Sequence, residues 1–404
     1  MDYAWIDGGG VTTPEGFVAG GVNAGIKTYG SEPRFDVGVL ASTEPCSVAG
    51  VFTKNRVVGA PVELCRERIQ DGQGRAIVAN SGCSNVATGE QGKRDAVRMA
   101  SVAAEHLAIP ESEVLVASTG VIGRNLPMER IERGIRQTRL SAGGGIEFSR
   151  AIMTTDIAPK HRALSVVVDG VKYTVGGTAK GSGMVHPDMA TVLCFMTTDA
   201  PVAPEWLKGA LRAVADVSLN MIDVDMDTST SDTMLLFANG LAGGSRIDRG
   251  HRAESPLRRA FEMVAIALAK DLVREGEGAR TVIEVQVRGA RTVDDARKAA
   301  RTVTSSPLVK TMVTGRDANL GRVMMAVGRS GADVDVSRTS VFIGEHAAFE
   351  RGAPTSVPYE VLSKALDQPE VVIAVDLGLG DASATAWGCD LTEEYVRINA
   401  SYTT

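Results

Sequence analysis

The chain has 404 residues, of which 44% are hydrophobic and 23% charged, so it can bury a large core as one elaborate domain or two. Its 43 basic and 49 acidic residues give a net charge of -6 and are mixed along the whole length, which excludes a basic stripe for nucleic acid and a polybasic arm for a membrane. No apolar run reaches the ~20 residues of a membrane span, and no signal peptide is recognisable. These features predict a cytoplasmic protein whose partners are small molecules.

The five cysteines and five histidines are dispersed, without CxxC or HExxH spacing. We therefore expect buried thiols, no disulfide framework and no metal. No glycine-rich segment completes a phosphate-binding loop or a GxGxxG motif. The chemistry must come from other groups.

The hydrophobic pattern predicts alternating helices and strands. One long helix is expected to have Ser255 as its N-cap and Pro256 at its first helical position. This mixed order predicts an α+β or a layered α/β fold. In chain order we expect a helix over 90–110, a strand over 113–119, a hairpin over 163–177 that turns at Asp169-Gly170, a strand from Thr191, a helix over 204–222, a strand over 234–240, a helix over 255–273, a strand over 281–290 and a helix over 292–303.

One stretch, KGSGMVHPDMATVLCFMTTDA over residues 180–200, places Thr191 where a glycine-rich polar segment becomes apolar. The plain interpretation is a loop followed by a buried strand. The sharper hypothesis is that the Thr191 hydroxyl attacks the Ala190 carbonyl and cuts the chain. The local residues alone do not decide between the two.

Four other segments carry polar groups, and each has an ordinary explanation. STGVIG puts Thr119 and Gly120 directly after a strand, either as oxyanion donors or as a plain turn. AIMTTD offers Thr154 and Thr155 as ligands or as a helix cap. EGEGAR sets Glu277 between two glycines, where its carboxylate belongs either to a binding site or to a solvated loop. RINASYTT ends the chain, and chain termini usually fray.

Together and in order, these segments resemble one family. With NAGIK, GVFTKNRV, NSGCSNVATGEQG, DTSTSDT, SPLVKT, DANLGRV and CDLTEEYV they are similar to the signature segments of ornithine acetyltransferase, the glutamate N-acetyltransferase family of arginine biosynthesis. The resemblance spans residues 23–404. It implies a layered α/β fold of the DmpA/ArgJ-like, N-terminal-nucleophile type.

The resemblance also implies a reaction. The chain would cut itself into an alpha chain, 1–190, and a beta chain, 191–404, which stay together in a heterotetramer or larger assembly. Acetyl would pass from N2-acetyl-L-ornithine to L-glutamate through acetyl-Thr191 without a cofactor, and acetyl-CoA is left open as a further donor. The implied site comprises Thr191 as nucleophile, Ala190 at the cleaved bond, Thr119 and Gly120 in the oxyanion hole, and Thr154, Lys180, Thr191, Glu277, Asn399 and Thr404 as substrate contacts.

Elementary chemistry agrees with these roles. A new N-terminal Thr191 supplies its own base, because an α-amine has a reference pKa of ~7.7–8.0. One lysine suits the α-carboxylate of an amino acid, and one glutamate suits the ornithine amine.

Several positions depart from the family pattern. Cys83 stands where Asn is usual, Met226 where Gly is usual, Leu320 where Trp is usual, and Arg280-Thr281 where Thr-Lys is usual. They leave open an acetyltransferase of an antibiotic pathway with a different amino-acid partner. Two alternatives come from other classes of protein. The first is an amidohydrolase or aminopeptidase of related fold, in which water takes the acyl group. The second is a non-catalytic binding protein.

Overall fold

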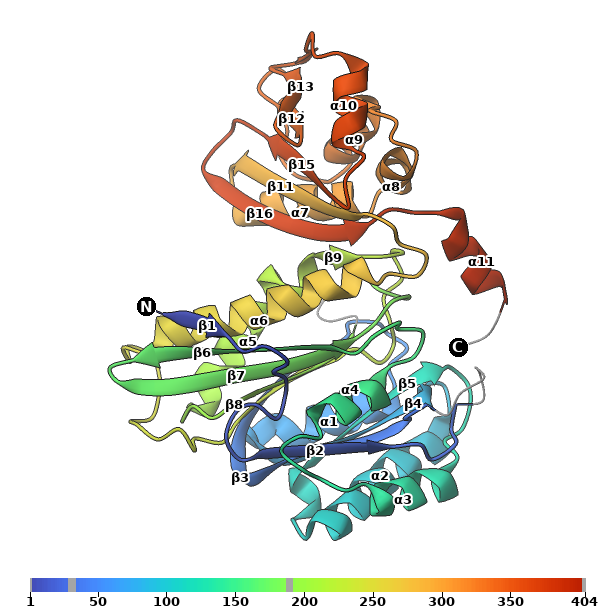
Figure 1. Ribbon diagram of the computed structural model, residues 1–404, viewed down its shortest axis with the longest axis vertical. Coiled ribbons are helices and arrows are strands. Elements are labelled where there is room, and N and C mark those ends of the chain that lie inside the picture. The colour runs from blue at the N-terminus through green and yellow to red at the C-terminus, as the bar shows by residue number, and fades with distance from the viewer. Residues whose placement is uncertain (1, 28–33, 187–191, 402–404) are drawn as a thin grey trace.

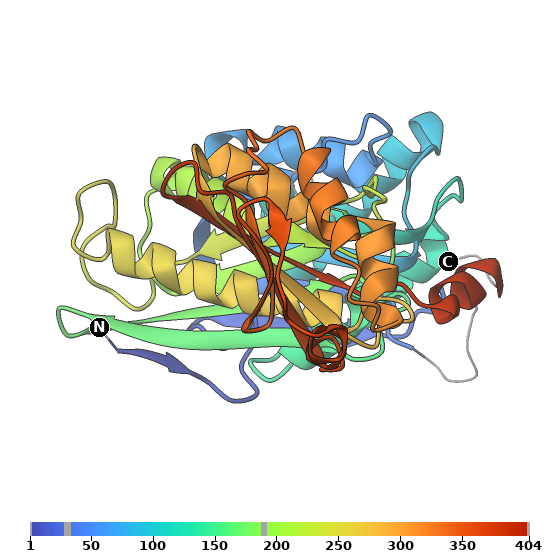
Figure 2. The same ribbon diagram turned by 90° about the horizontal axis from the view of Figure 1, so that it is seen from above.

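The structure is a computed structural model that describes residues 2–27, 34–186 and 192–401. Two β-sheets and their helices form stacked layers (Figure 1), and β1 and α11 (Tyr3–Trp5 and Glu393–Ser401) lie on opposite sides of the molecule in both views (Figure 2). The mixed, layered α/β architecture expected from the sequence is confirmed. None of the described helices is long and apolar enough to cross a membrane.

The larger sheet has nine strands among the described residues, in the order β1-β6-β7-β8-β10-β3-β4-β5, with β2 beside β3. Its central strands come from both sides of position 191, because β8 and β10 lie between β7 and β3. The strands are β1, β2 (Phe17–Val22), β3 (Val37–Phe52), β4 (Gln73–Cys83), β5 (Val114–Val121), β6 (Lys160–Val168), β7 (Val171–Lys180), β8 (Leu193–Thr198) and β10 (Thr233–Ala238).

The smaller sheet has seven described strands, in the order β14-β13-β12-β15-β11-β16-β9. All of them lie after position 191, so this layer is built by the C-terminal half of the chain. The strands are β9 (Ile222–Asp223), β11 (Val282–Ala290), β12 (Ser340–Ile343), β13 (His346–Glu350), β14 (Ala353–Pro354), β15 (Glu370–Asp376) and β16 (Ala382–Cys389).

The helices cover the sheets and separate them. Figure 1 shows α6 between the two sheets, and it contacts β6 and β7 of the larger sheet and β16 of the smaller one. The helices are α1 (Ala60–Arg68), α2 (Gly89–Leu107), α3 (Met128–Gln137), α4 (Gly145–Ile152), α5 (Pro204–Val217), α6 (Glu254–Arg274), α7 (Val293–Thr304), α8 (Pro307–Thr314), α9 (Leu320–Gly328), α10 (Tyr359–Ala365) and α11, with short 3-10 turns η1 (Ile69–Asp71), η2 (Glu111–Glu113) and η3 (Leu219–Met221).

Strand β8 is buried on both faces. Its alternate side chains enter two different cores, as the period of two in a strand requires. Cys194 and Met196 pack in the cluster that contains α5 and α6. Leu193 and Phe195 pack in the cluster on the α4 side, where the Phe195 and Phe148 ring centroids lie 5.6 Å apart. This explains why the sequence of β8 is a continuous apolar run.

Most predicted elements are present within a few residues of their expected bounds. The 163–177 hairpin turns at Asp169-Gly170, whose φ values of 50° and 81° fit a type I′ turn. The start of the 255–273 helix was predicted wrongly, because α6 begins at Glu254 with Ala253 as its N-cap. Pro256 is tolerated there because N–H groups of a first turn have no helical partner. All five cysteines are buried and free.

Candidate active site

The end of β5 supplies Thr119 and Gly120. Gly120 has φ 120°, and a Cβ there would lie 2.5 Å from the backbone carbon of Gly82 on the neighbouring strand β4. Only glycine fits this position, so β5 ends with a stretch of bare backbone beside the Thr119 hydroxyl. Such an arrangement is suited to an oxyanion hole.

The end of β7 supplies Lys180, which is 8% exposed and pairs with Leu193 of β8. Its Nζ lies 3.3 Å from Thr119 Oγ1. Since an ammonium only donates, the Thr119 oxygen accepts and its own O–H stays free to donate elsewhere. Burial lowers the pKa of Lys180, and the nearby Asp156 carboxylate opposes that shift.

Asp156 was not predicted from the sequence, although it ends the AIMTTD segment. It accepts hydrogen bonds from the backbone N–H of Thr154 at 3.0 Å and of Gly181 at 2.8 Å, and from Lys160 Nζ at 2.7 Å. Burial alone would raise its pKa, but the charges of Lys160 and Lys180 hold the pKa of Asp156 below its usual range. This buried carboxylate ties together the two segments that carry Thr154 and Lys180.

Glu277 and Asn399 supply two further groups of the candidate site. Asn399 Nδ2 on α11 donates to Glu277 Oε2 at 2.8 Å. The Glu277 backbone N–H donates to the Ser182 carbonyl at 2.7 Å. Gly278, at φ 72°, lies close to α11, because a Cβ there would be 2.5 Å from the Tyr395 backbone nitrogen. The glycine that follows Glu277 therefore allows α11 to pack against it.

These groups line one cavity of about 120 Å³. It contains six of the nine residues predicted for the site, together with Val192, the residue that follows Thr191 in the chain. Ala190, Thr191 and Thr404 lie outside the described residues. The six predicted residues in the lining are Thr119, Gly120, Thr154, Lys180, Glu277 and Asn399.

The cavity has a further wall that was not assigned a role from the sequence. It is formed by residues 229–232, within the segment DTSTSDT, which was noticed only as part of the family pattern. Asp232 is 2% exposed, and its Oδ2 has no hydrogen-bond partner among the described residues. Burial raises the pKa of Asp232 well above its usual range.

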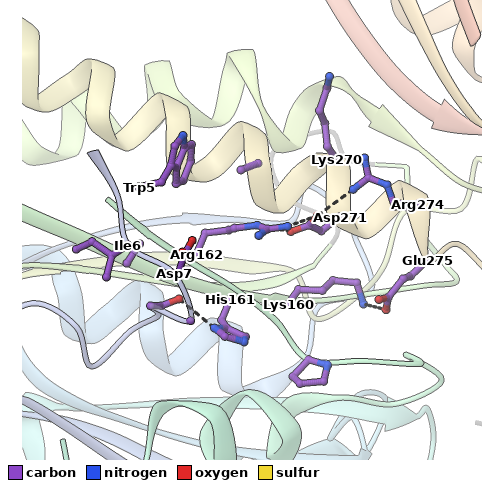
Figure 3. Close-up of a pocket in the computed structure, with 15 residues that line it drawn as sticks. Trp5, Ile6, Asp7, Lys160, His161, Arg162, Lys270, Asp271, Arg274 and Glu275 are labelled. Carbon is purple, nitrogen blue, oxygen red and sulfur yellow. Dashed lines mark hydrogen bonds and ion pairs between the residues drawn. The ribbon is translucent and has the colours of Figure 1, made fainter. Parts of the chain in front are cut away.

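A larger cavity lies elsewhere. Figure 3 shows this space of about 580 Å³, lined by residues of β1, β6 and α6. Its cations face carboxylates, as in the 2.8 Å pairs Arg162–Asp271 and Lys160–Glu275. Lys160 lines the larger cavity and also pairs with Asp156 at 2.7 Å. It therefore connects the larger cavity to the carboxylate that holds the Thr154 and Gly181 backbone beside the smaller one. The predicted residues, rather than cavity volume, identify the candidate active site.

The four departures from the family pattern lie outside the described lining of the active-site cavity. Cys83 is buried at the end of β4, and Leu320 begins α9. Arg280 is on the surface, 3.1 Å from Glu393. Met226 has φ 65°, a left-handed conformation that favours glycine and so explains why glycine is the usual residue there.

Comparison with known proteins identifies the family. The profile of the ArgJ family matches residues 18–404. The chain belongs to the ArgJ family. It is 50% identical over 402 residues to the arginine biosynthesis bifunctional protein ArgJ of Symbiobacterium thermophilum, covering 99% of this chain and 100% of that protein.

Two solved structures are also similar to this ArgJ-family chain. The crystal structure of the arginine biosynthesis bifunctional protein ArgJ from Bacillus halodurans is 39% identical, with a TM-score of 0.50, and covers 51% of this chain and 97% of the solved chain. An ornithine acetyltransferase from Mycobacterium tuberculosis, complexed with ornithine, is 38% identical, with a TM-score of 0.44, and covers 47% of this chain and 100% of the solved chain. The family and the acetyltransferase class predicted from the sequence are confirmed.

Proposed function

We propose that this ArgJ-family enzyme cuts itself between Ala190 and Thr191 and then uses Thr191 to move acetyl from N2-acetyl-L-ornithine to L-glutamate. One observation carries the proposal. The residues expected at the oxyanion and at the substrate come from segments far apart in the sequence, yet they line one cavity with the residue that follows Thr191.

The self-cleavage step balances without a cofactor. The Thr191 hydroxyl attacks the Ala190 carbonyl carbon, the peptide C–N bond breaks, and an ester to Thr191 forms. Water then hydrolyses the ester, which releases the Ala190 carboxylate and leaves Thr191 with a free α-amine. That amine is a base near neutral pH, because its reference pKa is ~7.7–8.0.

In the transfer step, Thr191 attacks the acetyl carbonyl of acetylornithine and its α-amine takes the hydroxyl proton. The negative charge that develops on the carbonyl oxygen is stabilised by the Thr119 hydroxyl and the Gly120 N–H. The proton passes to the leaving ornithine amine. Glutamate then attacks the acetyl ester through its amine, which restores the Thr191 hydroxyl.

Two charged side chains of the cavity, Lys180 and Glu277, account for the proposed substrate recognition. Lys180 is suited to the α-carboxylate that ornithine and glutamate share. Glu277, held by Asn399 at 2.8 Å, is suited to the side-chain amine of ornithine. Thr154 and Thr404 complete the proposed substrate contacts. Acetyl-CoA remains a second donor that the family pattern leaves open.

The two products, 1–190 and 191–404, are expected to stay together. Strands β8 and β10 belong to the second product and lie between β7 and β3 of the first. Separation would break the β7–β8 and β10–β3 pairings and expose the apolar cores on both faces of β8. The match covers 97% of the solved Bacillus halodurans chain but only 51% of this chain, so the solved chain is about half as long. This length supports a division of the chain into two products.

We further propose that the paired products assemble into a heterotetramer or larger oligomer and act in the cytoplasm. Size-exclusion chromatography with light scattering tests the assembly. A single two-chain unit at micromolar concentration would contradict it.

The decisive experiment is intact-mass spectrometry of the Thr191 chain. Wild-type protein should consist of two chains that meet at Ala190-Thr191, and Thr191→Ala should remain a single chain. Thr191→Ser keeps the hydroxyl and should still cut. An intact wild-type precursor with full activity would refute the proposal.

The same experiment separates transfer from hydrolysis. After exposure to acetylornithine, the Thr191 chain should gain one acetyl group, which L-glutamate should remove faster than water does. Equal loss to water with or without glutamate would favour the amidohydrolase alternative.

A further inference from the structure

Two buried polar side chains of the active-site cavity have no role in the cutting and transfer steps described above. Ser231 and Asp232 are 7% and 2% exposed, and both line the cavity. Neither Ser231 Oγ nor Asp232 Oδ2 has a hydrogen-bond partner among the described residues. Because buried polar atoms in folded proteins are almost always hydrogen-bonded, these two atoms point to a further polar group that binds here.

The pairing of β8 with β10 places Asp232 beside the start of the second product. Thr233 pairs with Leu193 in the parallel ladder, and its N–H donates to the Val192 carbonyl at 3.0 Å. The same register sets Asp232 beside Val192, and both residues line the active-site cavity. Neighbouring strands lie about 4.8 Å apart, and Cα atoms joined by a trans peptide lie about 3.8 Å apart. The proposed cut creates an N-terminus on the residue before Val192, so the new amine is within reach of the Asp232 side chain.

The charges around Asp232 leave its carboxyl open to a second cation. Burial raises the pKa of Asp232, whereas the Ser229 hydroxyl and the charge of Lys180 oppose that shift. Lys180 Nζ, however, contacts the Thr119 hydroxyl at 3.3 Å. A cation that binds Asp232 Oδ2 must therefore come from elsewhere. The charged groups that act on Lys180 itself are Asp156, Asp232, Lys160 and Glu277.

We propose that the Asp232 carboxylate accepts a hydrogen bond from the α-amine of Thr191 and is the positioning residue for that base. The inference rests on the proposed function, because this amine exists only after the chain is cut. A protonated amine has three N–H donors, so the Ser231 hydroxyl can accept a second one.

The proposed contact serves the transfer step without a change in its balance. As the Thr191 oxygen bonds to the acyl carbon, the hydroxyl proton moves to the α-amine and the Asp232 carboxylate stabilises the ammonium that results. An adjacent ammonium in turn favours the ionised form of a carboxyl group. The proton later passes from the ammonium to the leaving ornithine amine. Nucleophile, base and a third group that orients the base are the usual parts of a covalent catalyst.

The first test compares Asp232→Asn with the wild-type protein. Asn keeps the size of the side chain and replaces a carboxyl whose charged form is disfavoured by burial, so the variant should fold. Intact-mass spectrometry should show the same two chains in both proteins. The kcat per cleaved chain, measured at alkaline pH where the amine is uncharged, should fall by about 10²-fold.

Asp199→Asn is the matched control. Asp199 follows the far end of β8, is 5% exposed, and also has a pKa that burial raises. Its carboxylate accepts a hydrogen bond from the Thr174 N–H at 2.7 Å, so it has a structural partner that Asp232 Oδ2 lacks. Asp199→Asn should lower the Tm but keep kcat per cleaved chain within about twofold of wild type.

A second measurement reads the pKa of the Thr191 amine directly. Cyanate carbamoylates only an uncharged amine, so its rate of reaction with the substrate-free cleaved protein, followed by peptide mapping between pH 6 and 10, gives this pKa. Because a carboxylate favours the charged amine, the wild-type value should lie above the reference of ~7.7–8.0. Asp232→Asn should lower it by about one unit or more, and Asp199→Asn should not change it. A purely structural role of Asp232 would not move this value.

The outcomes separate this proposal from the proposed function. A wild-type amine pKa below the reference range would overturn the Asp232 contact, whether or not the variant folds. So would an unchanged kcat and amine pKa in Asp232→Asn, and both results leave the proposed function intact. A folded Asp232→Asn that stays a single chain would assign Asp232 to the cutting step instead. A wild-type protein without a free amine on Thr191 would refute the proposed function as well.

Discussion

Replacement of Asp156 by Asn would remove the charge that supports the active-site cavity and keep the shape of the side chain. In the wild-type protein Asp156 is 3% exposed and contacts Lys160, the Gly181 N–H and the Thr154 N–H at distances of 2.7, 2.8 and 3.0 Å. The amide of the substituted side chain would offer a single acceptor oxygen where the carboxylate offers two. Lys160, also 3% exposed, would keep only Glu275 as its partner among the contacts described above, at 2.8 Å.

The expected loss in the free energy of unfolding follows from this geometry. Removal of one partner of a buried ion pair costs about 3–5 kcal/mol, and the remaining Glu275 places Asp156→Asn near the lower end. With an unfolding entropy of about 2.1 cal/mol/K per residue, a loss of about 3 kcal/mol lowers the Tm of a chain of this length by about 3–4 °C.

The pH dependence has a definite sign. The folded pKa of Asp156 is depressed, so its contribution is present above the unfolded pKa of ~3.9 and is lost as pH falls through the folded value. The Tm difference between wild type and Asp156→Asn should therefore be constant between pH 7 and about pH 5 and shrink below about pH 4.

The assay is thermal unfolding at several pH values, with Asp271→Asn as control. Asp271 pairs with Arg162 at the surface, where an ion pair contributes about 0–1 kcal/mol. Self-cleavage of Asp156→Asn should also slow, because the Gly181 and Thr154 N–H groups lose the carboxylate that accepts hydrogen bonds from both. If Asp156→Asn melts like Asp271→Asn and cuts at the wild-type rate, the supporting role of Asp156 is wrong.

Thr119→Ala should lower kcat by on the order of 10²-fold in steady-state kinetics, and a change below about threefold would contradict its role at the oxyanion. Glu277→Gln should raise KM for acetylornithine more than KM for glutamate, whereas equal increases would refute selective contact with the ornithine amine. Because burial lowers the pKa of Lys180, KM for both substrates should rise with pH at values below the ordinary lysine pKa of 10.5; a flat KM profile up to pH 10.5 would count against a charged Lys180. Met226→Gly relieves a positive φ of 65° but frees the unfolded chain, so chemical denaturation should show a stability within about 1 kcal/mol of wild type, and a larger loss would mean that the Met226 side chain stabilises the loop.

The amino-acid sequence was enough to establish the family, the enzyme class and the local structure of several helices and strands between residues 90 and 303. Helices such as α2 and α7 were predictable because apolar residues recur at helical spacing within the segment itself. The β6–β7 hairpin was predictable because Asp169-Gly170 is a turn signal between two apolar runs. Nine candidate site residues could be named because each belongs to a short family motif, and six of them line one cavity.

How distant segments meet became visible only in the folded chain. Asp156 and Asp232 look like ordinary polar residues in the sequence, and only their burial beside Lys180 shows their importance. The smaller sheet was not predicted as a unit, because its strand order depends on pairings such as β11 with β15 and β16. The five cations that line a second cavity, of about 510 Å³, are spread over residues 54–329 and converge only when α7 and α9 pack together. Local periodicity specifies helices and strands, but contacts between remote residues depend on sheet register and packing of the whole chain.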